Sequence, residues 1–157
     1  MKRKITVLFL LAGLIVIPAT AQDFTSPKIQ FLSFNFGVPV GYDLETKDMI
    51  AGSNFGIGFA VIDNLTVAYD NIATAVGNAA SLLRLSFSFS DKFGGALSFG
   101  GNKTVTYACL GVYGNFFQAR AASGLAYGLG LRLDYLTRTD DFGKGKALFI
   151  INASFGL

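Results

Sequence analysis

Histidine and tryptophan are absent from this chain of 157 residues, and cysteine occurs once, at Cys109. Without an imidazole the chain has no Ser-His-Asp triad and no histidine-ligated metal site, and one cysteine excludes an internal disulfide framework or a cysteine-cluster metal site. Charged residues make up only 15% of the sequence, against roughly 25% in a typical soluble domain. We therefore expect no catalytic residue, no metal and no cofactor.

The formal net charge of +3 comes entirely from the first four residues. Lys2, Arg3 and Lys4 account for three of the 13 basic residues, which leaves 10 basic against 10 acidic residues in the rest of the chain. A neutral chain has no basic surface for nucleic acid, so no nucleic-acid partner is expected.

The N-terminus has the pattern of a secretory signal peptide. The three basic residues precede a mostly apolar run, residues 5–17, which is too short for a comfortable membrane span. Pro18 ends this run, and Ala19-Thr20-Ala21 is a small-x-small cleavage motif. The pattern predicts a signal peptide over residues 1–21, cleavage after Ala21, and an exported mature chain of residues 22–157.

Large apolar residues recur at every second position in the mature chain, with small residues between them. The alternation covers residues 32–40, 55–61, 83–90 and 125–135. A soluble sandwich would carry Lys, Glu, Thr and Gln on its second face, whereas here that face is mostly Gly, Ala and Ser. The large face either points into lipid around a narrow lumen, or forms the core of a soluble barrel with a poorly charged surface.

Eight strands are predicted in this pattern, and their connections alternate in length. The strands cover residues 29–42, 54–62, 65–71, 80–90, 92–100, 105–117, 124–135 and 147–157. Tight turns near residues 63–64, 91 and 118–123 alternate with longer connections at residues 43–53, 72–79 and 136–146, with one short exception at residues 101–104. An even strand number with turns at one end and longer loops at the other is typical of an outer-membrane barrel.

Aromatic residues cluster near the predicted strand ends. Tyr favours the loop end, and the predicted girdle there consists of Tyr42, Phe55, Tyr69, Phe99, Tyr107 and Tyr135. The girdle predicted at the turn end consists of Phe31, Phe89, Phe93, Phe116 and Phe155. Two aromatic belts of this kind mark the two membrane interfaces of a barrel.

The signal segment, the eight alternating strands and the terminal strand together resemble the small outer-membrane β-barrel proteins of diderm bacteria, of the OmpA-membrane-domain, OmpX and OmpW type. In these families, hydrophobic residues at the last and third-last positions are read by the barrel-assembly machinery, and Leu157 and Phe155 occupy those positions here. Asn152 stands where the family pattern favours Gly. The resemblance implies an all-β, eight-stranded antiparallel up-and-down transmembrane barrel in the bacterial outer membrane. Its termini are periplasmic, and its partners are outer-membrane lipid and the assembly machinery.

Four charged residues are predicted to face the lumen. Arg84, Arg132 and Asp134 share the small face of their strands, and Asp70 lies on the strand that pairs with that of Arg84. An unpaired guanidinium in a dry lumen is costly, so we expect each arginine to have an acidic or hydroxyl partner. Asp134 is the candidate beside Arg132, and Asp70 is the other candidate, on the strand next to Arg84. Such a cluster is either a structural salt-bridge plug, or a gate or solute-selective site.

Three functions fit these observations. The first is a non-enzymatic integral membrane protein with a filled lumen and a structural or surface-interaction role, whose surface ligand is unknown. The second is a porin-like narrow pore for small or apolar solutes. The third is a secreted soluble barrel of the lipocalin or avidin kind that binds a hydrophobic ligand. Barrel enzymes of similar architecture use a catalytic histidine, which this chain lacks.

Overall fold

The computed structural model describes residues 32–75 and 79–157, and these residues form eight β-strands. The strands are β1 (Leu32–Asp43), β2 (Asp48–Ile62), β3 (Leu65–Thr74), β4 (Ala80–Ser88), β5 (Phe93–Gly101), β6 (Thr106–Arg120), β7 (Ala126–Arg138) and β8 (Gly145–Gly156). The predicted signal peptide, residues 1–21, and the predicted strand residues 29–31 lie outside the described residues. Within the described ranges, no helix is long and apolar enough to cross a membrane.

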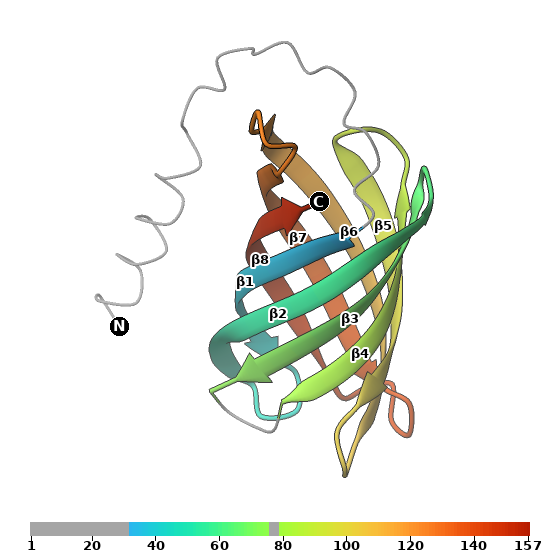
Figure 1. Cartoon of the computed structure of the whole chain (residues 1–157). Helices are drawn as coiled ribbons and strands as arrows, with labels where there is room; N and C mark the ends of the chain where they lie inside the picture. Colours follow the sequence, from blue (N-terminus) through green and yellow to red (C-terminus); the bar gives the residue numbers. More distant parts are fainter. Residues whose placement is uncertain (1–31, 76–78) are drawn as a thin grey trace, which may run out of the picture.

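Each strand pairs antiparallel with the next, and β8 pairs with β1, which closes the sheet into a barrel. The prediction of an all-β, eight-stranded antiparallel up-and-down barrel is therefore confirmed. Figure 1 shows that the chain leaves β8 at the end of the barrel where β1 begins. We call this the turn end, because residues 63–64, 89–92 and 121–125 also connect strands there; the opposite end is the loop end.

The strands are strongly staggered around the barrel. Following the paired residues once around, from Leu32 through β2 to β8, returns to β1 at Tyr42, ten residues further along. A stagger of ten residues over eight strands corresponds to a strand tilt of about 40°. An eight-stranded barrel of this kind has an interior that side chains can fill.

The connections predicted to be long are shorter in the structure, because the strands extend further. The second strand begins at Asp48 rather than at residue 54, and β7 continues to Arg138. The connections at the loop end contain four to six residues, against two to five at the turn end. In the first of them, the Asp43 carboxylate accepts hydrogen bonds from the backbone N–H groups of Glu45 and Thr46, which makes a tight turn of a charged segment.

Most large side chains of the strands point outward and most small ones point into the barrel, which is the first of the two arrangements that the sequence allowed. Phe59, Leu83 and Leu129 point outward and are exposed, whereas Gly58 and Gly128 are buried on the inside. Tyr107 is a correction to the predicted loop-end girdle, because it is 9% exposed and points into the lumen. Phe55 lies in the middle of β2 because that strand begins earlier than predicted.

Two irregularities shift the strand register, between Ala60 and Ile62 in β2 and between Asn115 and Phe117 in β6. A bulge adds one residue to one strand and so reverses the alternation beyond it. Phe116 and Phe117 are consequently both exposed, on the outer surface near the turn end. The bulge therefore adds the aromatic side chain of Phe117 to the girdle predicted there.

Candidate functional site

The four predicted lumen residues meet at mid-height of the barrel. Asp70 lies on β3, Arg84 on β4, and Arg132 and Asp134 on β7. Because β3 and β7 are four strands apart in either direction around an eight-stranded barrel, their side chains meet only by crossing the lumen. We refer to these four residues as the charge quartet.

Each arginine of the charge quartet contacts both carboxylates. Arg84 donates from Nε to Asp70 Oδ2 at 2.7 Å and from Nη2 to Asp134 Oδ2 at 2.5 Å. Arg132 donates from Nη1 to Asp70 Oδ2 at 2.9 Å, and its Nε lies 2.8 Å from Asp134 Oδ2 as an ion pair. Sequence reasoning named the candidate pairs within β7 and between β3 and β4, and it missed the two pairs that cross the lumen.

The charge quartet is deeply buried, and its charges balance. The four side chains are 0–7% exposed, and two guanidinium groups face two carboxylates. In this setting the loss of one charge is far more costly than the presence of the balanced set. Some buried polar atoms, Arg84 Nη1, Arg132 Nη2 and Asp134 Oδ1 among them, have no hydrogen-bond partner within the described part of the chain.

Two glycines make room for the carboxylates. A Cβ atom at Gly56 would overlap Asp70 Oδ1, and a Cβ atom at Gly111 would overlap Asp134 Oδ1. Glycine at these two positions of β2 and β6 therefore allows a neighbouring carboxylate to lie against the barrel wall.

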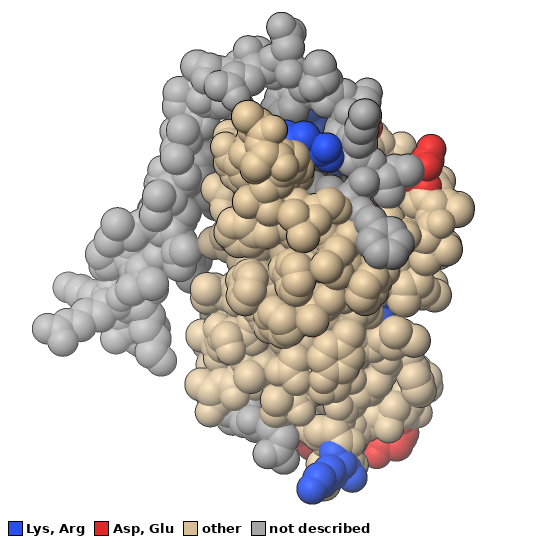
Figure 2. Space-filling model, viewed as in Figure 1, with Lys and Arg blue, Asp and Glu red and all other residues tan. Residues whose placement is uncertain are grey.

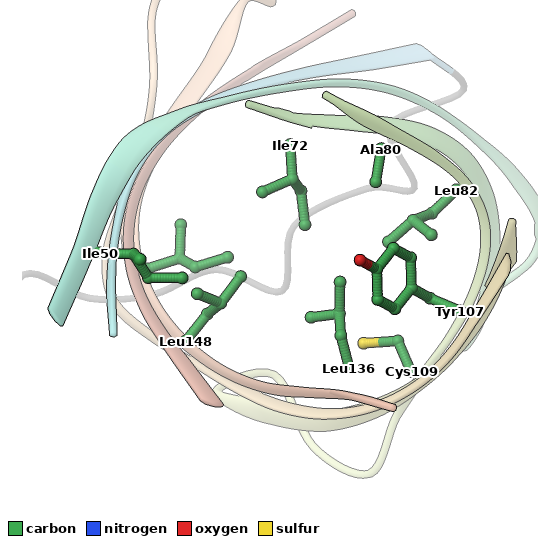
Figure 3. Packing of buried hydrophobic residues seen from close by; sticks show 9 residues of the cluster. Ile50, Ile72, Ala80, Leu82, Tyr107, Cys109, Leu136 and Leu148 are labelled. Carbon is green, nitrogen blue, oxygen red and sulfur yellow. The ribbon is translucent and has the colours of Figure 1, made fainter. Parts of the chain in front are cut away.

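On the loop-end side of the charge quartet, apolar side chains close the lumen. Leu82 and Ile150 are 0% exposed and Leu136 is 2% exposed. Figure 3 shows Leu82 and Leu148 pointing inward from opposite walls, together with Leu136, Tyr107 and Cys109. The full cluster, which we call the apolar plug, consists of Ile50, Ile72, Ala80, Leu82, Tyr107, Cys109, Leu136, Leu148 and Ile150. Sequence reasoning missed it, because residues 148–151 of β8 are large on both faces and give no clear alternation.

On the turn-end side of the charge quartet, the lumen holds a polar cavity of about 430 Å³. Asp70, Arg84 and Arg132 form its floor, and Asp63 and Asp91 lie at its mouth. Its walls carry hydroxyl and amide groups from Ser33, Asn35, Thr66, Ser86, Ser88, Tyr113, Asn115, Gln118, Asn152 and Ser154. The lumen is thus divided into an apolar half and a polar half, with the charge quartet between them.

A second group of charges joins two connections at the loop end. Arg138 contacts Glu45 at 3.3 Å and Asp140 at 2.6 Å, and Lys146 pairs with Asp43. The hydrogen bonds from Arg138 hold the pKa of Asp140 below its ordinary value. These contacts tie the β1–β2 connection to the β7–β8 connection.

The two residues of the predicted assembly signal lie at the closure of the barrel. Phe155 is on the outer face of β8, with its ring 6.3 Å from that of Phe36. The backbone N–H of Leu157 donates to the Leu32 carbonyl at 2.9 Å, so the chain end continues the pairing of β8 with β1.

Among the described residues, no group of His, Cys, Asp and Glu side chains is arranged to hold a metal ion. Comparison of the chain with protein-family models, with curated proteins and with solved structures finds no match. The candidate site is therefore defined by the geometry of the lumen alone.

Proposed function

We propose that this protein is an integral β-barrel protein of the bacterial outer membrane, with a structural or surface-interaction role and a lumen closed by side chains. The observation that carries this proposal is the chemistry of the outer surface. Between the first and last residues of each strand, no outward-facing position of the described strands carries a charge. The charges within the strands either belong to the quartet or lie at the strand ends.

Figure 2 supports the same interpretation, since on the visible face most charged atoms gather at the two ends of the barrel and a largely uncharged band lies between them. Large apolar side chains are exposed on all eight strands, and because exposed apolar patches on soluble monomers rarely exceed a few hundred Å², such a surface needs a covering. The strands are 9 to 15 residues long, and about 9–11 residues suffice for a tilted strand to cross a bilayer.

The outer surface also contains an apolar hollow of about 740 Å³ near the loop end. It lies over Ala147, whose small side chain is paired in register with Tyr42 on one side and Tyr135 on the other. A lipid acyl chain fits this chemistry, and the two tyrosines stand where an interfacial belt places them.

The two other functions are less well supported. A lipocalin-like barrel needs large apolar residues around an internal ligand cavity, whereas here the cavity is polar and most large residues point outward. A through-going pore needs an open lumen, whereas the apolar plug fills the loop-end half.

The proposed role names outer-membrane lipid and the barrel-assembly machinery as partners, with Phe155 and Leu157 as the segment read during assembly. It places the turn end in the periplasm and the loop end outside the cell. The charged connections that contain Glu45 and Asp140 would then form the outer surface.

Fractionation of cells that express the full chain tests this proposal. We expect the mature protein in the outer-membrane fraction, released only by detergent, with a gel mobility that changes when the sample is boiled. A closed barrel keeps its compact shape in cold detergent and loses it on heating, which is the reason for the shift. A mature protein that stays soluble without detergent would show the proposal to be wrong.

A further inference from the structure

The turn-end cavity is lined by groups that both donate and accept hydrogen bonds. Ser33 bonds to the Gly58 carbonyl, and Ser88 bonds to Tyr113. The amide side chains of Asn115 and Gln118 also line the cavity. So does Asn152, whose buried Oδ1 has no hydrogen-bond partner among the described residues, and a buried polar atom of this kind needs a partner from the contents of the cavity.

The charges around the cavity argue against a charged occupant. The floor is neutral, because Arg84 and Arg132 are balanced by Asp70 and Asp134. Asp63 and Asp91 are the charged residues that line the mouth, and an anion would reach a floor with no net positive charge. A cation would meet no unbalanced carboxylate at that floor.

The cavity also offers one aromatic ring, that of Tyr113, beside its hydroxyl and amide groups. Phe89 and Tyr127 lie at its edge, with their rings on the outer surface beside Gly95 and Phe117. An aromatic ring with convergent polar groups, in a volume between about 300 and 1,000 Å³, is typical of small-molecule sites. An uncharged polyol presents hydroxyl groups that donate and accept, and C–H faces that can lie on an aromatic ring.

The cavity is closed at its inner end. The charge quartet forms the floor, and the apolar plug lies directly beyond it. A polar solute in the cavity would have to cross the buried side chains of Leu82, Leu136 and Ile150 to reach the loop end.

From these observations we propose that the turn-end cavity is a binding site for a small uncharged polyhydroxylated solute, of mono- or disaccharide size, which enters and leaves through the turn end. The site depends on the barrel and its lumen and not on the membrane. It therefore adds a binding activity to the proposed function, and the two can fail separately.

Thiol labelling of the purified full-length protein in detergent micelles tests whether the cavity is open. A cysteine in place of Ser86, in a Cys109→Ala background, should react with a small positively charged methanethiosulfonate reagent, because Ser86 lines the cavity. Native Cys109 is 4% exposed in the apolar plug and should remain unreactive in the folded protein. A Ser86→Cys variant that labels only after unfolding would overturn the proposal.

Protection of that cysteine tests the ligand class, with sucrose as the probe. Sucrose should slow labelling at position 86 along a saturation curve, by about fivefold at about four times its Kd, because only the unliganded fraction reacts. Labelling of Ser123→Cys, in the exposed β6–β7 connection and outside the cavity, should be unaffected. Adding Asn115→Leu to the position 86 variant should remove the protection, while the gel mobility shift shows that the barrel is intact.

Sodium phosphate and spermidine at equal concentrations serve as the charged comparisons, and neither should protect. Equal or better protection by either one would show that the proposed ligand class is wrong. Labelling that sucrose leaves unchanged up to solubility-limited concentrations would show a cavity that holds only water, and would also overturn the proposal. Because these measurements are made in micelles, neither result depends on where the protein resides in the cell.

Discussion

Arg132 shows how a single residue depends on the whole barrel. Its own strand supplies Asp134, and the opposite wall supplies Asp70, so its charge is balanced by residues that are 62 and 2 positions away in the sequence. Replacing Arg132 removes one of two positive charges and leaves both carboxylates facing Arg84 alone.

Arg132→Met should lower the free energy of unfolding by about 3–5 kcal/mol, because it leaves an uncompensated buried charge. The double variant Arg132→Met with Asp134→Asn restores the charge balance and should recover part of that loss. Denaturant titration of the wild type, both single variants and the double variant in detergent measures these differences. Single effects that simply add would show that the residues are not coupled.

Gly111 is small because the Asp134 carboxylate occupies the space beside it. Gly111→Ala should destabilise the barrel by about 1–3 kcal/mol, the usual cost of overpacking. Gly95→Ala is the matched control, because its Cβ atom would meet only the far edge of the Phe89 ring, at 3.2 Å. The same titration compares the two variants, and an equal effect of both would remove the assigned role of Gly111.

Strand β7 displays the alternation of the whole barrel most regularly. From Ala126 to Leu136 its residues are buried at every even position, and outward at every odd position. Leu129 lies outside and Gly130 inside, and the same separation of faces holds in β8 and in β6 up to its bulge at Asn115.

Leu133→Arg should destabilise the barrel by about 2–4 kcal/mol in a lipid bilayer, because Leu133 faces outward near the middle of β7 and the change places a charge in the hydrocarbon. The matched control is Phe142→Arg in the β7–β8 connection, where the residue is 72% exposed and no strand is disturbed. Refolding and unfolding of both variants in lipid vesicles measures the difference. Equal stability of the two variants would count against a lipid-facing β7.

The whole molecule has a lumen with two barriers, the charge quartet and the apolar plug. Planar-bilayer recordings of the wild type should show no ion conductance, because the apolar plug offers ions no polar path. The variant Arg132→Met with Asp134→Asn should also be silent, since the plug remains. Steady conductance in the wild type would favour the pore function, and conductance in that variant alone would make the charge quartet the gate.

The alternation of large and small residues allowed the strand number, the antiparallel barrel and the outward large face to be predicted, because side chains alternate between faces along every strand. The same alternation placed Arg84, Arg132 and Asp134 on one face, and Asp70 with them. It was least reliable at strand ends. Residues 43–53 resemble a loop because several of them are charged, but Asp43 closes a tight turn and β2 already begins at Asp48.

Sequence alone therefore determined the class of fold and the four charges inside it. The cross-lumen contacts, the apolar plug and the turn-end cavity were decided only by the tertiary structure. Their residues come from strands far apart in the chain, and the ten-residue stagger and the bulge in β6 set which of them share a height. No local pattern contains that information, because closure of the barrel brings these residues together only after all eight strands have paired.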